Sequence, residues 1–297
     1  MSGKTFIDGA RSDDPRISVY DRGFLYGDSV FEVIRTYGGK PFGLDEHVAR
    51  LHRSATKIAM ELPWSEAALL AEIDGAVREV GFEESYIRVI VTRGVGKLGL
   101  DPDLADSPTR VVMIHPLTLP PLPVYRDGVG VFIIDSMRAT DGTAAEGAKS
   151  SNYLANLLAL RDAKKHGAYE PVFIHQNEVL EGGTSNVFAV FGNTLVTPPE
   201  RRILGGITRK HVLACAHELP NIETRIESIS LERFRAADEL FLTSTIREIV
   251  PIVRIVEPGG SHVVGNGAPG SATRAIHRAF RARLGAKTSP MPWEQPS

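Results

Sequence analysis

The sequence predicts an α+β fold in which a small α/β domain precedes a larger domain with a mixed, barrel-like sheet. Strand-like runs are interrupted by isolated helices without regular alternation, which favours α+β over a doubly wound sheet. The run PLTLPPLP at 116–123 cannot donate a regular hydrogen-bond ladder and predicts a linker. The expected parts are a first domain at 1–118, a linker at 119–123, a second domain at 124–288 and a disordered tail at 289–297.

The first domain is expected to combine strands with two helices. The stretch 44–60 is predicted to be helical because Leu44, Val48 and Leu51 follow the i, i+4, i+7 rhythm. A second helix is expected at 64–80, with Ser65 as its N-terminal cap. Strands are predicted at 17–20, 29–37, 86–93 and 109–116.

The second domain is richer in short strands. Helices are expected to start near Asn152, Thr208 and Ser271. No internal repeat is present. Strands are predicted at 128–134, 170–175, 185–192, 193–198, 221–228, 238–244 and 249–256.

Bulk properties exclude several classes of function. A formal net charge of −2 gives no electrostatic basis for binding nucleic acid or an anionic membrane. The single cysteine, Cys215, cannot form an internal disulfide and predicts a reducing compartment, with the thiol as a small core residue. Because no long apolar run or signal-peptide core is present, we expect a cytoplasmic protein. No metal site is predicted.

Residues 94–99, GVGKLG, match the dinucleotide fingerprint G-x-G-x-x-G in form. That fingerprint requires a helix immediately afterwards, whose N-terminus receives the pyrophosphate. The following residues, LDPDLADSP, contain two prolines and no apolar periodicity. A loop between two strands is therefore the better interpretation.

Lys149 permits two interpretations. Most lysines are solvated surface residues, and this one would be no exception in a loop. Its neighbours Gly147, Ala148 and Ser150 are small, however, and a helix is expected to begin directly afterwards. Desolvation and the positive end of a helix dipole both favour the neutral amine, which is the nucleophile that attacks an aldehyde.

Three further stretches bear on this choice. Glu181, before two glycines, is either an exposed turn residue or the partner of a pyridinium nitrogen. In LGGITR, 204–209, the glycines precede a helix start near Thr208, which is either a capped turn or a phosphate cradle. Arg50 is either an exposed helical arginine or a phosphate ligand, and Ser244 and Thr245 form a turn that offers anion-binding donors.

Together these groups supply an amine, a pyridine partner and phosphate contacts, which is the set that pyridoxal 5'-phosphate requires. The sequence from Phe6 to Arg281 resembles the fold-type IV pyridoxal-phosphate enzymes, or class IV aminotransferases. The resemblance is carried by DRGFLYGDSVFEVIRTY, LDEHVARLHRSA, YIRVIVTRG, AKSSNYLANLLA, LEGGTSNVF and LGGITR, and by residues 238–253. It implies a larger pseudo-barrel domain at the C-terminal side, the cofactor between the two domains, and a homodimer.

The resemblance also implies roles for individual residues. Lys149 matches the catalytic lysine that binds the cofactor as a Schiff base, and Glu181 matches the acid that faces the pyridine nitrogen. Tyr153 falls where the family often has a tyrosine near O3' of the ring, and Leu204 matches the apolar residue under the ring. The implied phosphate ligands are Arg50, Ile207, Thr208, Ser244 and Thr245.

The resemblance leaves the substrate open. Phe31, Glu32 and Arg35, with Tyr86 and Arg88, match branched-chain amino acid aminotransferases, whereas Val33 and the Lys149-to-Tyr153 spacing favour a D-amino acid or (R)-selective amine transaminase. Leu98 and Leu100 stand where the D-amino acid enzymes carry a charged carboxylate trap. We therefore expect ping-pong transfer from an L-branched-chain amino acid to 2-oxoglutarate, with the D-amino acid or (R)-amine activity, an aminodeoxychorismate lyase and a catalytically silent cofactor-binding protein as alternatives. The residues expected to line the substrate pocket are Tyr26, Phe31, Val33, Arg35, Tyr86, Arg88, Leu98, Thr245 and Ile246.

Overall fold

The computed structural model describes residues 3–135, 143 and 145–284, and the chain divides into two compact units. The first unit comprises Met1–Thr118 and Gly142–Tyr153, and the second comprises Leu119–Asp141 and Leu154–Ser297. The division after residue 118 falls where the sequence placed it. The structure groups 142–153 with the first unit, whereas the sequence assigned this segment to the second domain. The reason is that residues around Lys149 pair with a strand of the first unit.

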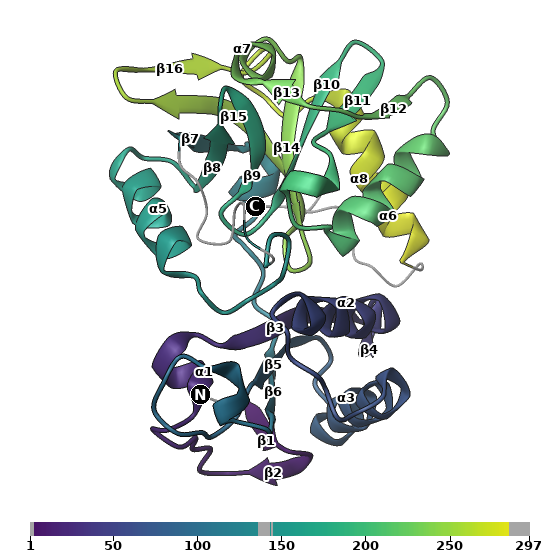
Figure 1. Cartoon of the computed structure of the whole chain (residues 1–297). Helices are drawn as coiled ribbons and strands as arrows, with labels where there is room; N and C mark the ends of the chain where they lie inside the picture. Colours follow the sequence, from purple (N-terminus) through teal and green to yellow (C-terminus); the bar gives the residue numbers. More distant parts are fainter. Residues whose placement is uncertain (1–2, 136–142, 144, 285–297) are drawn as a thin grey trace. The chain divides into compact units, whose positions relative to one another are not determined.

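The first unit is built on an antiparallel sheet that has two helices packed on one face (Figure 1). The helices are α2 (Leu44–Lys57) and α3 (Glu66–Val80), and Ser65 caps α3 by accepting a hydrogen bond from the Ala68 amide, as predicted. Within the described residues, the strands in order across the sheet are β2 (Ala10–Ser12), β1 (Lys4–Ile7), β6 (Thr109–Pro116), β5 (Ser85–Thr92), β3 (Ser29–Tyr37) and β4 (Lys40–Pro41).

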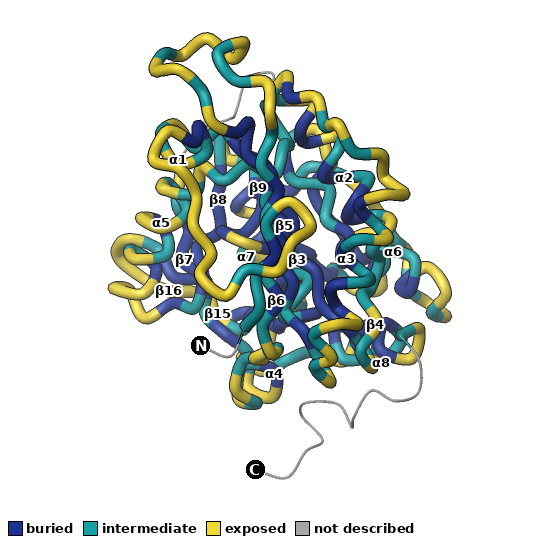
Figure 2. The backbone as a smooth tube through the Cα atoms, turned by 90° about the horizontal axis from the view of Figure 1, so that it is seen from below, coloured by how far each residue is buried: buried dark blue, intermediate teal, exposed yellow. Residues whose placement is uncertain are grey.

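Strand alternation decides which side chains of β3 meet the helices. Val30 and Ile34 belong to the buried cluster that also contains Val48 and Leu51 of α2, so even-numbered residues of β3 face α2. Odd-numbered residues then face the opposite side of the sheet. Figure 2 shows these central strands as the buried part of the unit.

The predicted strand at 17–20 is wrong. This stretch is an exposed loop that ends in a turn, with Val19 64% and Tyr20 54% exposed. Because no strand lies beside it, its backbone has no ladder to join. The loop leads instead into the short helix α1 (Arg22–Tyr26), which Asp21 caps by accepting from the Gly23 amide.

The second unit contains a mixed sheet that curls on itself. Strands β9 and β10, at separate places in the sheet order, also contact each other, so the sheet forms a partial barrel. Within the described residues, the order is β12 (Glu223–Ile226), β11 (Thr194–Thr197), β10 (Asn186–Phe191), β14 (Glu239–Ser244), β15 (Glu248–Glu257), β7 (Val129–Asp135), β8 (Glu170–His175), β9 (Glu178–Gly182) and β13 (Ile229–Ser230), and β16 (Gly260–Val263) also pairs with β15.

Helices cover the outside of this sheet. Helix α5 (Leu154–Lys165) packs on β7 and β8, while α6 (Ile207–His217) and α8 (Ser271–Arg283) pack side by side against β14 (Figure 1). Helix α5 begins two residues later than predicted. Short helical turns complete the unit at α4 (Pro123–Arg126), η2 (Glu200–Arg202) and α7 (Leu231–Arg235).

Three remaining predictions can be placed. Residues 119–122 form a loop that leads into α4, which starts with Pro123. Cys215 is buried in α6, as expected, and burial raises the pKa of its thiol. The predicted tail at 289–297 lies outside the described residues. No helix in the described part of the chain combines the length and the apolar character needed to cross a membrane.

Candidate active site

Lys149 is held in extended backbone beside β3. Its carbonyl oxygen accepts a hydrogen bond from the Phe31 amide at 2.9 Å, and its own amide donates to Oγ of Ser54 at 3.1 Å. An isolated bridge between Val30 and Ser150 continues this pairing. The expectation that a helix begins directly after Lys149 is wrong, because α5 starts only at Leu154. Strand pairing, and not a helix dipole, therefore positions this amine.

The ring of Phe31 is the centre of a cluster of predicted site residues. Nζ of Lys149 lies 4.5 Å from the ring centroid, and the guanidinium carbon of Arg88 lies 4.1 Å from it. Tyr153 meets the same ring edge-on at a centroid distance of 5.2 Å. An aromatic face attracts cations, so Phe31 fixes the positions of both the amine and the guanidinium.

The predicted substrate residues of the first unit share one face of its sheet. Val33 pairs with Arg88 and Arg35 with Tyr86 across β3 and β5, so these side chains lie together with Phe31 on the face opposite α2. The structure thus brings together five residues that the sequence placed in one pocket.

Arg50 is buried, so the interpretation as an exposed helical arginine is wrong. Its Nε and Nη2 donate to the two carboxylate oxygens of Glu32 at 2.7 and 2.6 Å. Nδ1 of His47 lies 2.7 Å from Oε2 of the same carboxylate. Burial alone would raise the pKa of Glu32, but the charges and hydrogen bonds of Arg50 and His47 outweigh it and lower that pKa to about 2.

His47 is the second buried partner of Glu32. Burial is the main cause that lowers the pKa of its ring below 6.5, and the positive charges of Arg50 and Lys149 lower it further, against the attraction of Glu32. Glu32 was expected only as a match to the branched-chain enzymes, and neither Glu32 nor His47 was predicted as a site residue. A signal was present, because Glu32 interrupts the apolar face of β3 between Val30 and Ile34.

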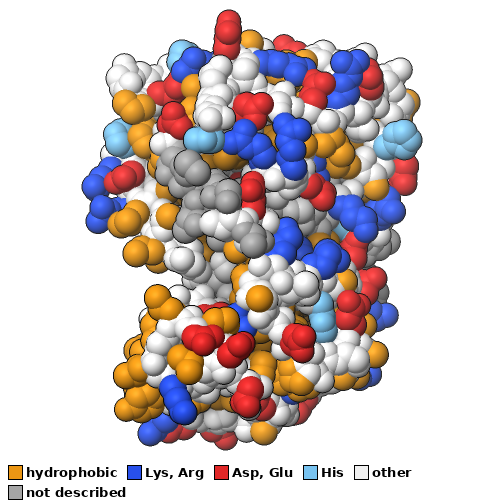
Figure 3. All heavy atoms as spheres, viewed as in Figure 1, with side chains coloured by type: hydrophobic (Ala, Val, Ile, Leu, Met, Phe, Trp, Pro, Cys, Tyr) orange, Lys and Arg blue, Asp and Glu red, His pale blue; other side chains and the backbone are white. Residues whose placement is uncertain are grey.

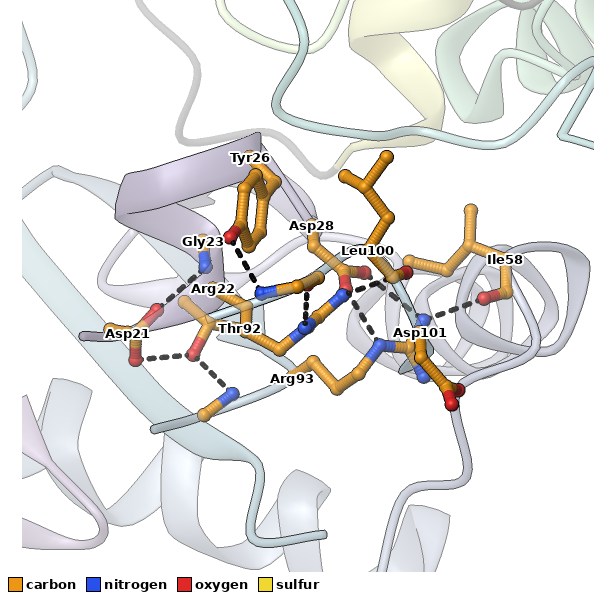
Figure 4. Close-up of polar contacts among 12 residues, drawn as sticks. Asp21, Arg22, Gly23, Tyr26, Asp28, Ile58, Thr92, Arg93, Leu100 and Asp101 are labelled. Atoms are coloured by element: carbon orange, nitrogen blue, oxygen red, sulfur yellow. Dashed lines mark hydrogen bonds and ion pairs between the residues drawn. The ribbon is translucent and has the colours of Figure 1, made fainter. Parts of the chain in front are cut away.

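The loop after β5 is fixed by a buried group of charges, shown in Figure 4. Asp28 accepts from Nε of Arg22 at 3.1 Å and from Nε of Arg93 at 2.7 Å. Arg22 in turn donates to the carbonyl oxygens of Gly99 and Leu100, and the hydroxyl of Tyr26 accepts from the Gly99 amide.

These hydrogen bonds hold the backbone of the loop, and its apolar side chains are exposed to solvent. Leu98 is 68% and Leu100 81% exposed. A single turn of 3-10 helix, η1 (Pro102–Leu104), follows the loop, so the helix that a dinucleotide fingerprint needs is not formed at 100–108.

Glu181 is held by two donors in the second unit. Its Oε2 accepts from Nδ2 of Asn186 at 3.2 Å and from the amide of Leu204 at 2.9 Å. Asn186 also donates to the Leu204 carbonyl at 2.9 Å. The carboxylate is only 8% exposed, so the interpretation as an exposed turn residue is wrong. Asn186 was not predicted as a site residue, because an asparagine at the start of a strand is typical of a turn.

The predicted phosphate ligands of this unit lie at two places, the start of helix α6 and the turn between β14 and β15. Helix α6 begins at Ile207, with Thr208 5% exposed, and its N-cap residue, Gly206, makes no side-chain capping hydrogen bond. A Cβ on Gly206 would overlap Oδ1 of Asn186, so glycine permits this close approach. Thr245 and Ile246 lie in the turn between β14 and β15, whose strands end at Ser244 and begin at Glu248.

Arg247 joins this turn to neighbouring segments. Its guanidinium donates to the carboxylate of Glu170 on β8, to Oγ1 of Thr184 and to Oγ of Ser244. The attraction of Glu170 outweighs the effect of burial and raises the pKa of Arg247 above its ordinary value. This pair was not predicted, because Glu170 and Arg247 are 77 positions apart in the sequence.

These residues fit pyridoxal 5'-phosphate, because they include a partner for its ring nitrogen and a partner for its phosphate. A buried, hydrogen-bonded carboxylate matches a protonated pyridine nitrogen, and uncapped helix amides with a buried threonine match a phosphate. In the part of the chain that the structure describes, no group of three or more histidine, cysteine or acidic side chains could hold a metal ion. Arg50, Lys149, Tyr153 and the substrate face belong to the first unit, and Glu181, Leu204, α6 and the 244–247 turn belong to the second.

Comparison with known proteins identifies the family. The description of amino-transferase class IV matches residues 29–255. A putative branched-chain-amino-acid aminotransferase of Methanocaldococcus jannaschii is 36% identical over 283 residues, which cover 95% of this chain and 94% of that protein. A D-alanine aminotransferase of Bacillus licheniformis is 31% identical, over 92% of this chain and 93% of that protein.

Solved structures show the same fold. The branched-chain amino acid aminotransferase of Escherichia coli aligns with a TM-score of 0.87 and 30% identity, over 95% of this chain and 94% of that chain. The T.th. branched-chain amino acid aminotransferase, solved with pyridoxamine 5'-phosphate, aligns with a TM-score of 0.87 and 27% identity, over 95% and 94% of the two chains. The fold is that of the fold-type IV pyridoxal-phosphate enzymes. The chain belongs to the class IV aminotransferase family.

Proposed function

We propose that this protein is a pyridoxal-phosphate-dependent aminotransferase that moves the amino group of an L-branched-chain amino acid to 2-oxoglutarate. The bound cofactor would supply an electron sink that stabilises the carbanion formed at the donor's Cα. Nζ of Lys149 would hold the cofactor covalently and, once released, would carry the proton that leaves Cα.

The other residues would hold the cofactor without taking part in proton transfer. Glu181 would keep the pyridine nitrogen protonated, and Asn186 and the Leu204 amide hold that carboxylate in one orientation. Thr208, the amide of Ile207 and the 244–246 turn would bind the phosphate, together with Arg50. Leu204 and Tyr153 would contact the faces and edge of the ring.

The observation that carries the branched-chain assignment is the apolar loop after β5. The family resemblance places its side chains Leu98 and Leu100 where the D-amino acid enzymes carry a charged carboxylate trap, and the buried Arg22 holds the loop in place. An apolar surface favours an aliphatic side chain over a carboxylate. Tyr26, whose hydroxyl contacts the same loop, would belong to this pocket.

A second candidate is a D-amino acid or (R)-selective amine transaminase. The observation that favours it is Val33, which lies beside Arg88 on the substrate face and adds bulk to that face. The 31% identity to a D-alanine aminotransferase supports the same candidate. A bulky β-branched side chain would restrict the orientation of the donor's substituents.

One assay separates the two candidates. The purified holoenzyme is given L-leucine, D-alanine or (R)-1-phenylethylamine as donor with 2-oxoglutarate as acceptor, and glutamate is measured. L-leucine should be the best donor, with parallel double-reciprocal plots that indicate ping-pong kinetics. Turnover of D-alanine or the amine alone would replace the first candidate by the second. Borohydride reduction followed by peptide mapping should place a pyridoxyl tag on Lys149, and a tag elsewhere would end both proposals.

We also propose that the protein is a cytoplasmic homodimer. The support for a dimer is a set of apolar side chains exposed around α1 of the first unit, where Figure 3 shows hydrophobic side chains gathered. Light scattering on the eluted protein should give twice the chain mass. These exposed side chains are Ile17, Val19, Tyr20, Phe24, Tyr26, Val95, Leu98 and Leu100.

A further inference from the structure

The turn between β14 and β15 contains an unusual residue. Ser244 pairs with Glu248, which leaves a three-residue loop, and Glu248 has φ of 58°. Hairpins with three-residue loops commonly place a glycine at such a left-handed position, because other residues meet a steric penalty there. A glutamate in this conformation has a higher energy than it would have in ordinary backbone. Such strain persists where surrounding contacts hold the residue in place.

The contacts that hold Glu248 come from α8. Its carboxylate accepts from Nε of Arg281 at 2.8 Å and lies 2.7 Å from Nε2 of His277. Glu248 is 2% exposed. Burial would raise the pKa of this carboxyl, but the hydrogen bonds and charges of His277 and Arg281 outweigh it and hold that pKa well below its usual range. The carboxylate form of Glu248 is therefore favoured in the folded protein.

Helix α8 is fixed firmly enough to serve as an anchor. At its N-terminal end, the carboxylate of Glu239 accepts from the amides of Ala272 and Thr273 and from the hydroxyl of Thr273. Glu239 begins β14, so the helix is attached to both ends of the β14–β15 hairpin. Helix α8 also packs against α6, whose first residues are the other proposed phosphate ligands.

The first unit contains a similar arrangement. There, Glu32 of a strand binds His47 and Arg50, three positions apart on one helix face. In the second unit, Glu248 of a strand binds His277 and Arg281, four positions apart on one helix face. Both carboxylates are buried, and each lies next to a proposed phosphate ligand.

We propose that Glu248, held by His277 and Arg281, is the positioning residue of the phosphate-binding turn and sets its affinity for the phosphate group of the cofactor. The inference rests on the proposed function of this turn. Glu248 and Arg247 secure the turn on its C-terminal side, so Thr245 and Ile246 keep a fixed orientation. Without the anchor, the turn would have to be ordered at the moment of binding, which lowers affinity.

Two substitutions separate the effect of the Glu248 carboxylate contacts from the effect of the backbone conformation at position 248. Glu248→Gly suits the left-handed backbone better than glutamate but removes the anchor. Glu248→Gln keeps the shape of the side chain but removes its charge. If backbone geometry alone mattered, Glu248→Gly would bind the phosphate as well as the parent protein does. The matched control is Glu257→Gln, which removes a carboxylate that pairs with Arg235 at the far end of β15.

The test measures binding of pyridoxamine 5'-phosphate and of pyridoxamine, which lacks the phosphate, to cofactor-free full-length protein by calorimetry. Both Glu248 variants should raise the Kd of the phosphate form about tenfold or more and change the Kd of pyridoxamine less than about twofold. Glu257→Gln should lower Tm and leave the ratio of the two Kd values unchanged.

The outcomes are separable. Parent protein that binds neither ligand overturns the proposed function. Parent protein that binds both, with an unchanged Kd ratio in a folded Glu248 variant, overturns this inference alone. If neither Glu248 variant folds, Arg281→Lys keeps the positive charge but loses the paired guanidinium donors. It should show the same selective loss, and an unchanged ratio in that variant likewise overturns the inference.

Discussion

Replacement of Glu32 by glutamine tests whether the buried carboxylate of the first unit stabilises the fold. The pKa of Glu32 falls from 4.5 to about 2 in the folded protein, and such a depression corresponds to roughly 3 kcal/mol in favour of the ionised form. Removal of one partner from a buried charge group typically costs about 3–5 kcal/mol, because the remaining charge is left uncompensated. Glu32→Gln should therefore lower the free energy of unfolding by about 3 kcal/mol at pH 7.

The sign of the pH dependence follows from the depressed pKa. The stabilisation by Glu32 is fully present above pH 4.5 and is lost as the pH falls toward 2. Urea unfolding of both proteins from pH 7 to pH 3 should thus show a difference in free energy that shrinks as the pH falls. The control is Asp74→Asn in the same unit, whose partner Arg78 it meets on the surface, with the two side chains 43% and 73% exposed. The cost should be about 1 kcal/mol or less. A difference between parent and Glu32→Gln that stays constant down to pH 3 would refute the electrostatic reasoning.

Three further substitutions test the site. Lys149→Ala should retain binding of pyridoxamine 5'-phosphate but lose turnover by at least about a hundredfold, as measured by single-turnover kinetics, since no other amine would carry the Cα proton; near-normal turnover would remove the lysine from the mechanism. Asn186→Ala should lower the affinity for the cofactor about tenfold and shift the absorption spectrum of the bound cofactor, because the Glu181 carboxylate loses a hydrogen-bond donor. An unchanged spectrum would show that Asn186 does not orient Glu181. Asp28→Asn should destabilise the protein by about 2–4 kcal/mol, because Arg22 and Arg93 would remain buried without their counter-charge. Limited proteolysis should then cleave the 94–101 loop faster than in the parent protein, and equal rates of cleavage would contradict the role of Asp28 in holding the loop.

Much of the site could be predicted from residue type and local context. A lysine among small residues, an acid before two glycines and a Gly-Gly pair before a helix each have a chemical meaning that depends on a few neighbouring positions. The helix at 44–60 and the strand at 29–37 could be predicted because periodic burial is reflected in the order of apolar residues. The stretch 17–20 shows the limit of that reasoning, because a strand also needs a partner, and the sequence does not reveal whether one lies beside it.

The residues that support the site could not be predicted in the same way. Glu248 joins residues on α8 that lie 29 and 33 positions away, and Arg247 joins Glu170 across 77 positions. Such pairs depend on which strands become neighbours, and strand order in a mixed sheet is set by the packing of the whole unit.

The sequence by itself determined the fold class, the family resemblance and the chemical identity of the reactive groups, because these depend on side-chain chemistry and local periodicity. Tertiary structure decided how those groups are held. It placed Lys149 beside β3 by strand pairing and buried Glu32 and Glu248 against histidine and arginine on helices. The physical reason is that a buried charge is stable only with its partners, and only the folded chain brings those partners within hydrogen-bonding distance.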